Sequence, residues 1–188
     1  MQADGNHLVM QAGGDIYLYT RAPDGSGTFE NLTHDNYGQW SPWVSGRYVV
    51  WIDQRDEPRG NILAPNNSEV YLYDIETRTR RRITHDPPER PVVQLQSMVR
   101  GDWIVWLDYR NAERPNPTPI EFQNNAAQIY GYHIPTGREL SLIPVLPPRA
   151  FMAEPMLTDG GLWYVCAFRT VDSWESGSYR MQLPAMPP

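Results

Sequence analysis

The chain contains no lysine, and all sixteen of its basic residues are arginine. The planar guanidinium of arginine suits fixed, two-point pairing with carboxylates, so we expect many of these side chains to pair with aspartate and glutamate. The formal net charge is −6. Nucleic-acid binding needs a concentrated positive field, and this charge therefore argues against a large nucleic-acid footprint.

Cysteine and long hydrophobic stretches are also scarce. Cys166 is the only cysteine, which excludes an internal disulfide and a thiolate metal cluster. It lies in an apolar run, where a buried, unreactive thiol is expected. No apolar stretch approaches ~20 residues, so we predict neither a membrane-spanning helix nor a signal peptide.

Turn-forming and aromatic residues, in contrast, are plentiful. The 188 residues include 18 prolines, 14 glycines, 11 tyrosines and 7 tryptophans, while strong helix formers are few. This balance is typical of short strands joined by many turns, and the length suits one domain.

The strongest signal is an internal repeat. The segment 45–56 aligns with 100–111, and its Trp51 recurs as Trp106 after 55 residues. A second element recurs in three places, 15–19, 69–75 and 128–134, and Leu-Thr-His-Asp at 32–35 returns as Ile-Thr-His-Asp at 83–86. With a degraded copy at either end, the repeats run roughly 1–41, 42–96, 97–154 and 155–188. A period of ~40–60 residues is typical of propeller blades.

Each full unit is predicted to form four strands. A short strand ends at a Gly turn (43–46), and a continuous apolar run (48–52) then indicates a strand buried on both faces. The third strand (70–74) alternates, with tyrosines on one side, and the polar fourth strand (79–84) is expected at an exposed edge. The fourth unit lacks a clear fourth strand. We therefore predict an all-β, propeller-like chain of about four blades, each an antiparallel four-stranded sheet.

These residues resemble the repeat of TolB-type β-propellers. The turn at Ser45-Gly46, the apolar strand 48–51, the Val-Tyr-Leu-Tyr-Asp run at 70–74 and Ile83-Thr84 carry the match, together with Ile129-Tyr130 and the Thr136-Gly137 turn. The resemblance implies the propeller fold, and it favours a bacterial periplasmic or extracellular location. It is poorly specific for function, because such propellers serve as docking platforms, enzyme lids and catalytic domains.

The blade number leaves three arrangements open. Such propellers usually close with six or more blades, and this chain holds about four. The chain is then a piece of a longer propeller, an unusual four-bladed ring, or a half-propeller completed by a second copy in a homodimer. Exposed sheet faces at the ends of an open arc would need partners.

Two repeated motifs are interpreted as structural. Asp53/Arg55 and Asp108/Arg110 share a spacing of two residues, and we favour an ion pair that fixes the loop after the second strand over a ring of ligand-binding groups. His34 and His85 occupy equivalent positions, each followed by Asp, which indicates a turn between blades. The basic run 78–82 is expected to be a solvated edge, and Trp40 and Trp43 are expected to pack between blades.

No motif for catalysis, cofactor binding or metal binding is predicted. The four histidines show no zinc-ligand spacing, and no Gly-x-Ser-x-Gly elbow follows a strand. A pair of carboxylates for glycoside hydrolysis needs only proximity in space, so that alternative stays open.

The long connections 54–68 and 109–127 leave the same position of two repeats, which is often the binding side of a repeat protein. They and their neighbours supply the candidate binding residues Arg55, Arg59, Tyr109, Arg110, Arg114, Phe122 and Trp174. We expect a noncatalytic scaffold that presents these loops to a protein partner or to a further copy of itself. The alternatives are a carbohydrate-binding or glycan-processing propeller, and the propeller part of a peptidase.

Overall fold

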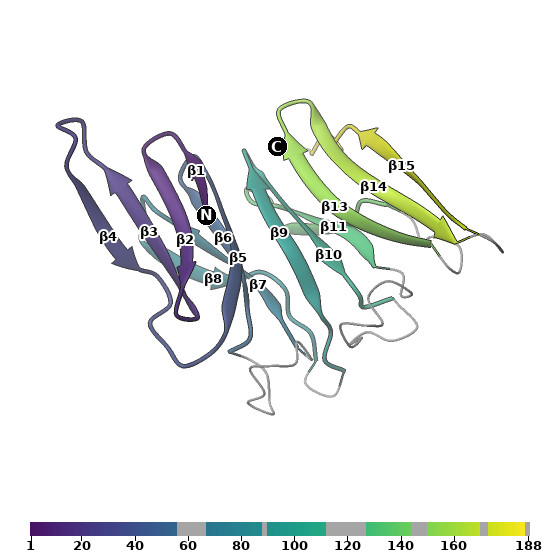
Figure 1. Ribbon diagram of the computed structural model, residues 1–188, viewed down its shortest axis with the longest axis horizontal. Coiled ribbons are helices and arrows are strands. Elements are labelled where there is room, and N and C mark those ends of the chain that lie inside the picture. Colours follow the sequence, from purple (N-terminus) through teal and green to yellow (C-terminus); the bar gives the residue numbers. More distant parts are fainter. Residues whose placement is uncertain (56–66, 88–89, 112–126, 144–149, 170–172, 187–188) are drawn as a thin grey trace.

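A computed structural model describes residues 1–55, 67–87, 90–111, 127–143, 150–169 and 173–186. Within these residues the chain forms four antiparallel sheets and no helix. The sheets, here named A to D in chain order, lie side by side like the ribs of an open fan (Figure 1). This arrangement confirms the predicted all-β, propeller-like fold. No helix of the described chain is long and apolar enough to cross a membrane.

Sheet A is the first of the four. Its strands pair in chain order and are β1 (Gln2–Asp4), β2 (His7–Ala12), β3 (Asp15–Arg21) and β4 (Gly27–Asn31). The turn between β1 and β2 is made at Gly5, whose φ of 55° lies in the left-handed region that glycine adopts without strain. Gly46 and Gly101 make the equivalent turns of the next two sheets with the same φ of 55°.

Sheet B has the same plan. Its strands are β5 (Gln39–Ser45), β6 (Tyr48–Asp53), β7 (Glu69–Asp74) and β8 (Thr79–Arg82). β6 is buried along almost its whole length, which confirms the strand predicted to be covered on both faces. β8 is the exposed edge strand that the polar sequence predicts.

Sheets C and D complete the fan. Sheet C contains β9 (Gln94–Arg100), β10 (Trp103–Asp108), β11 (Gln128–His133) and β12 (Arg138–Ser141). Sheet D contains β13 (Ala150–Thr158), β14 (Gly161–Arg169) and β15 (Trp174–Met181). The described part of sheet D therefore has three strands, as the degraded fourth repeat predicts. The division of the chain into one domain of four repeats at the stated boundaries stays a prediction.

The hydrophobic core consists of three clusters, one in each gap between neighbouring sheets. Val9, Ile16 and Leu18 of sheet A pack against Trp51 and Tyr71 of sheet B. Sheet B meets sheet C through a second cluster, and sheet C meets sheet D through a third. The first strands of the sheets, β1, β5, β9 and β13, also lie next to one another in that order.

β7 has the alternation that its sequence predicts, and both of its faces are buried. Its residues do alternate between the two faces, because Val70 and Leu72 join the cluster toward sheet C while Tyr71 and Tyr73 join the cluster toward sheet A. Both faces are nevertheless buried, because a neighbouring sheet covers each of them. Tyrosine is therefore a core residue here rather than a sign of an exposed face.

Candidate functional site

The predicted ion pair at the end of β6 is present. Asp53 is fully buried, and its Oδ2 accepts a 2.8 Å hydrogen bond from Trp51 Nε1. Arg55 folds back onto the same carboxylate, with Nε 2.9 Å from Oδ1 and Nη2 2.6 Å from Oδ2. The Arg55 guanidinium also lies over the Tyr71 ring, 4.8 Å from its centroid. With the backbone N–H of Arg55 as a further donor at 2.9 Å, the carboxylate is occupied within the fold.

Sheet C repeats this cluster at the end of β10. Trp106 Nε1 donates to Asp108 Oδ2 at 2.8 Å, and Arg110 donates to both carboxylate oxygens at 2.9 and 2.7 Å. Arg110 lies 4.2 Å from the Tyr130 centroid and also donates to Glu139 at 2.6 Å. The two repeats support the structural interpretation of the Asp-x-Arg motif. Binding roles for Arg55 and Arg110 stay predictions. In either role, the arginine would have to contact a partner while its guanidinium is already paired with an aspartate of the same sheet.

The other predicted binding residues are less informative. Tyr109 is buried in the cluster between sheets C and D, and burial raises the pKa of its hydroxyl. That position supports packing rather than partner contact. Trp174 begins β15, but its side chain lies outside the described part of the chain. Arg59, Arg114 and Phe122 also fall outside the described residues, and their binding roles stay predictions.

The repeated Thr-His-Asp motif connects each sheet to the following one: its threonine bonds to its own sheet and its aspartate bonds to the first strand of the next. Thr33 Oγ1 donates to Asp15 at 2.9 Å and accepts the backbone N–H of Ile16 at 3.0 Å. Asp35 then accepts hydrogen bonds from the Tyr37 backbone N–H at 3.0 Å and from Gln39 Nε2 at 2.8 Å. The predicted turn role of this motif is confirmed for Asp35.

The second copy of the motif makes matching contacts. Thr84 Oγ1 donates to Glu69 at 2.5 Å and accepts the backbone N–H of Val70 at 2.9 Å. Asp86 accepts from Gln94 Nε2 at 2.5 Å, as Asp35 does from Gln39. Burial of Glu69 outweighs its bond to Thr84 and raises its pKa to about 7.

The arginines of the run 78–82, which begins in the turn before β8, are largely exposed, and three of them contact neighbouring sheets. Arg78 donates to Glu30 of sheet A at 2.7 Å, and Arg80 donates to the Leu32 carbonyl at 3.2 Å. Arg81 lies over the Tyr132 ring of sheet C, 5.6 Å from the centroid. The run therefore connects sheet B to both neighbours, so the expected solvated edge also stabilises the packing of the sheets.

The feature that sequence reasoning missed is a groove along the first strands of the four sheets. β5, β9 and β13 each carry a bulge at the same place. In β5 the bulge lies between Trp40 and Trp43, and in β13 it lies between Ala153 and Met156. In β9 it lies opposite the segment from Val105 to Leu107 of β10. Bulges of this kind turn side chains away from the regular ladder. At two of them the first of the two bulge residues, Ser41 or Gln96, has a positive φ of 53°.

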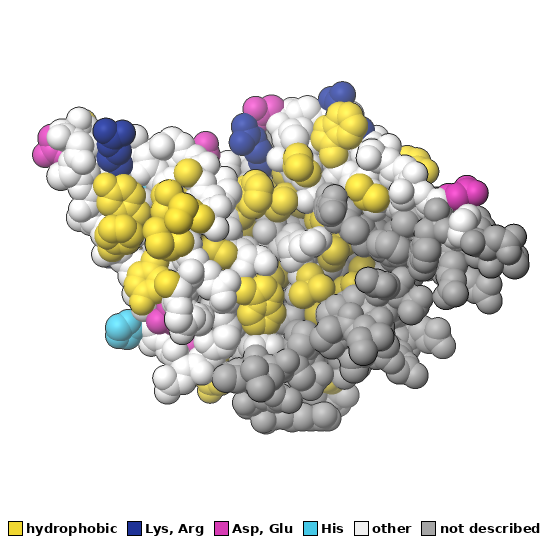
Figure 2. Space-filling model, in the orientation of Figure 1, with side chains coloured by type: hydrophobic (Ala, Val, Ile, Leu, Met, Phe, Trp, Pro, Cys, Tyr) yellow, Lys and Arg dark blue, Asp and Glu magenta, His cyan; other side chains and the backbone are white. Residues whose placement is uncertain are grey.

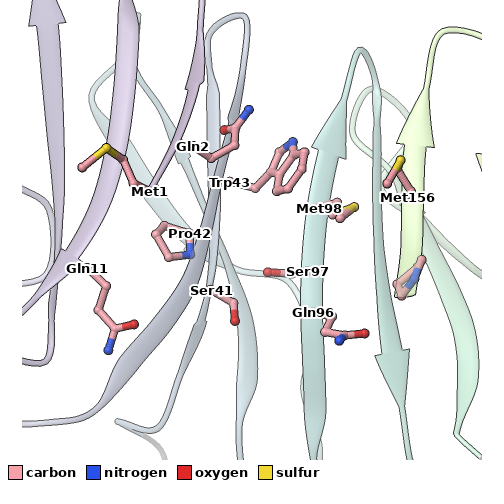
Figure 3. A pocket seen from close by; sticks show the side chains of 11 residues that line it. Met1, Gln2, Gln11, Ser41, Pro42, Trp43, Gln96, Ser97, Met98 and Met156 are labelled. Carbon is pink, nitrogen blue, oxygen red and sulfur yellow. The ribbon is translucent and has the colours of Figure 1, made fainter. Parts of the chain in front are cut away.

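These bulges line a groove of about 680 Å³. Its lining residues are Met1, Gln2, Gln11, Ser41, Pro42, Trp43, Gln96, Ser97, Met98, Pro155 and Met156. Figure 3 shows the Trp43 ring in the gap between its own strand and β9, and Met98 pointing from β9 toward Met156. The lining is apolar with amides and hydroxyls between, and no acidic or basic side chain of the described chain belongs to it.

Ser97 stands out within the groove. It is the second of the two residues that oppose one residue at its bulge, where β5 and β13 carry Pro42 and Pro155. Its side chain is buried, and its Oγ has no hydrogen-bond partner. In Figure 3 it points from β9 toward β5. A buried hydroxyl without a partner is costly, so this atom marks a place where a polar ligand group or water would be stabilised.

Cysteine and potential metal ligands bear on the role of the groove, because they are common carriers of reactive chemistry. Cys166 is buried, and burial raises the pKa of its thiol, which agrees with the predicted unreactive cysteine. Across the described ranges, no group of three or more His, Cys, Asp or Glu side chains is placed to hold a metal ion. The groove residues can donate and accept hydrogen bonds and can cover apolar surface.

Comparisons with known proteins support the fold alone. Fourteen chains of solved structures match, among them the crystal structure of TolB from Acinetobacter baumannii. The TM-score is 0.55 and the identity is 17% over 93% of this chain. The fold is propeller-like and similar to that of TolB. This chain spans 37% of the length of the TolB chain. No protein-family model and no curated protein sequence matches it.

Proposed function

We propose that the chain is a noncatalytic propeller-like scaffold that binds an extended segment of a protein partner in the groove along β5 and β9. The unpaired, buried hydroxyl of Ser97 carries the proposal, because it is a hydrogen-bonding group that the fold itself leaves unused. A peptide backbone offers donors and acceptors at regular intervals, and it is neutral like the lining of the groove.

The strand edges add to this argument. β5 and β9 each pair with a single strand of their own sheet, because each lies at the end of its sheet order. Their bulges interrupt the free edges and so disfavour continuous strand addition. The interactions with a partner segment would therefore come from the side chains of the groove, with Trp43 as the aromatic anchor and the glutamine amides around it.

Glycan processing receives less support. Hydrolysis of a glycoside requires two carboxyl groups on either side of the scissile bond. The described groove lining contains neither aspartate nor glutamate. Binding of a neutral glycan against Trp43 needs no carboxylate, so oligosaccharides belong in the same experiment as a competing ligand class.

The test is selection from a library of displayed linear peptides, followed by titration of synthetic peptides against the purified chain. Ser97→Ala removes the hydroxyl, Trp43→Ala removes the anchor, and Ser178→Ala is the matched control on exposed β15. We expect both groove variants to weaken peptide binding at least tenfold while the control binds as the wild type does. Selected peptides that bind all four proteins equally would refute the groove, and binding of neutral oligosaccharides alone would favour the glycan function.

The predicted long loops can be tested in the same format. Shortening 109–127 to a tight turn is expected to spare folding. Loss of peptide binding in this variant alone would move the site from the groove to the loops.

A further inference from the structure

Three large exposed hydrophobic side chains lie on the two sheets at the ends of the fan: Phe29 on sheet A, and Trp163 and Tyr179 on sheet D. The described residues include three more, Met1, Tyr37 and Met156, of which Met1 and Met156 line the groove and Tyr37 precedes β5. Figure 2 shows hydrophobic side chains over β2–β4 at one end and another hydrophobic group beside a basic side chain near β13 and β14. Sheets B and C, which have a neighbour on each side, contribute none of the six.

The sheets bury their faces by a repeated rule. We call the face toward the preceding sheet the back face and the opposite one the forward face. On the back face of sheet B, Val49 is opposite Tyr73 and Trp51 is opposite Tyr71. All four side chains are buried in the cluster with sheet A, and Tyr71 is only 7% exposed.

Sheet C follows the same rule. Ile104 is opposite Tyr132, and Trp106 is opposite Tyr130. These side chains pack into the cluster with sheet B, where Tyr130 is 9% exposed. The back face is thus built from the second and fourth residues of the second strand, together with two tyrosines of the third strand.

Sheet A carries the same back face, and no sheet of the described chain covers it. Leu8 is opposite Tyr19 and Met10 is opposite Tyr17, again the second and fourth residues of the second strand with two tyrosines. None of these four is buried, and Phe29 extends the face onto β4 beside Tyr19 with a ring separation of 4.7 Å. Phe29 is 66% exposed. Within the described chain nothing packs on this face, and it is apolar.

Sheet D exposes the complementary face at the other end. Its forward face contains Trp163 and Val165, which match the positions of Val50 and Ile52 that sheet B buries against sheet C. Trp163 is 42% exposed, and the Arg180 guanidinium lies 5.6 Å from its ring centroid.

We propose that the back face of sheet A binds the forward face of sheet D of a second copy of this chain, and that two such contacts close a homodimer of eight sheets. In each gap within the chain, a back face packs on a forward face, so the two open ends of one copy are complementary to the two open ends of another. At the gap between sheets B and C, Arg81 of the forward side covers Tyr132 of the back side. Arg180 is placed on sheet D to cover Tyr17 or Tyr19 of the second copy in the same way.

The proposal does not depend on peptide binding by the groove. A two-fold dimer forms both contacts at once and leaves neither apolar end face exposed. It also brings two copies of the groove to a shared axis. A chain that stays monomeric would keep its groove, so the two proposals can fail separately.

The first part of the experiment is the molar mass of the purified chain by sedimentation equilibrium. We expect the wild type to have twice the 21.7 kDa mass of one chain. Phe29→Arg and Trp163→Arg change one end face each at exposed positions, and each is expected to weaken dimerisation at least tenfold. Tyr179→Arg is the matched control, because Tyr179 is an exposed aromatic residue of sheet D on its back face, opposite Tyr164. Far-UV circular dichroism confirms that all variants are folded.

The second part distinguishes head-to-tail pairing from pairing of identical faces. One chain carries Phe29→Cys and another Trp163→Cys, both with Cys166→Ala, and a short bismaleimide is added. We expect covalent dimers when the two chains are mixed and none when either is treated alone. A monomeric wild type, a mass that keeps rising with concentration, or crosslinking of the Phe29→Cys chain with itself would each overturn the proposal.

Discussion

The indole nitrogen of Trp51 donates a 2.8 Å hydrogen bond to the carboxylate of Asp53, two residues later on the same strand. Trp106 and Asp108 repeat this bond at 2.8 Å. In both sheets the carboxylate is fully buried and is neutralised by an arginine that returns from the following loop. The bond therefore joins the buried indole to the last residue of the strand, and the arginine extends this contact into the connection that follows.

This relationship predicts that Asp108→Asn destabilises the fold by about 3 kcal/mol, because the buried carboxylate accepts hydrogen bonds from the Trp106 indole and from the backbone and guanidinium of Arg110, and an amide cannot accept all of them. Arg110→Gln is expected to cost a similar amount, since it leaves the fully buried carboxylate of Asp108 without a charged partner. Urea denaturation of both single variants and the double variant gives the coupling energy of the pair.

The control for this cycle is the exposed pair between Arg100 and Asp159, which joins sheets C and D. Asp159→Asn is expected to leave the denaturation midpoint unchanged, because an exposed pair is screened by water. If Asp108→Asn were as mild as this control, the cluster would not be holding the loop.

The Thr-His-Asp motif predicts a second effect. Thr84→Val keeps the shape of the side chain but removes the hydroxyl that Val70 N–H and Glu69 both use. Two buried groups lose their partner, so we expect a loss of roughly 1–3 kcal/mol in the free energy of unfolding.

Thr79→Val is the matched control for Thr84→Val. Thr79 lies on exposed β8, where its hydroxyl bonds to Thr77 at 2.7 Å. Thermal denaturation followed by circular dichroism is expected to show a lower midpoint for Thr84→Val only. Equal midpoints for the two variants would mean that the hydroxyl of Thr84 contributes nothing to stability.

The fold was predictable because its signals are local and repeated. The Gly turn followed by 48–52 and 103–107 fixes a buried strand by composition alone, and the structure places β6 and β10 there. The Asp-x-Arg pairs were also predictable, since opposite charges two residues apart lie on one side of an extended chain.

The groove was not predictable from the sequence. It depends on bulges in β5, β9 and β13, which are irregularities of register rather than of composition. Ser97 has no sequence signature of its own, because its importance comes from burial without a partner. A weak signal existed in the equivalent prolines Pro42 and Pro155, since proline within a strand often marks a bulge or an edge.

Glu69 and Asp15 occupy equivalent positions at the start of β7 and β3, yet their pKa values shift in opposite directions. Burial raises the pKa of Glu69 to about 7, against the bond from Thr84 and the nearby Arg82. Burial acts the same way on Asp15, but hydrogen bonds from Asn31 and Thr33 outweigh it, and the net effect lowers its pKa.

The pH dependence of stability follows from the sign of each shift. Between its ordinary pKa of 4.5 and about 7, Glu69 holds its proton in the folded chain but releases it in the unfolded chain. The folded state therefore binds more protons in this window, and its stability falls as the pH rises. A shift of this size corresponds to about 3 kcal/mol between pH 4.5 and 7. Asp15 acts in the other direction, because the stability from a lowered pKa is lost as the pH falls through the acid range.

The measurement is the free energy of unfolding in urea from pH 3 to pH 8 for the wild type, Glu69→Gln and Asp15→Asn. The quantity compared is each variant minus wild type, which cancels the titration of carboxylates unaffected by the change. We expect the free energy of unfolding of Glu69→Gln to increase steadily relative to that of the wild type as the pH rises toward 7, because glutamine has no proton to release. The stability of Asp15→Asn relative to the wild type should not rise between pH 4.5 and 7. Asp15→Asn should be less stable than the wild type there, and the difference in free energy of unfolding should become smaller only at acid pH. Parallel curves for the wild type and Glu69→Gln would mean that Arg82 keeps Glu69 ionised throughout, so that burial does not control this carboxyl.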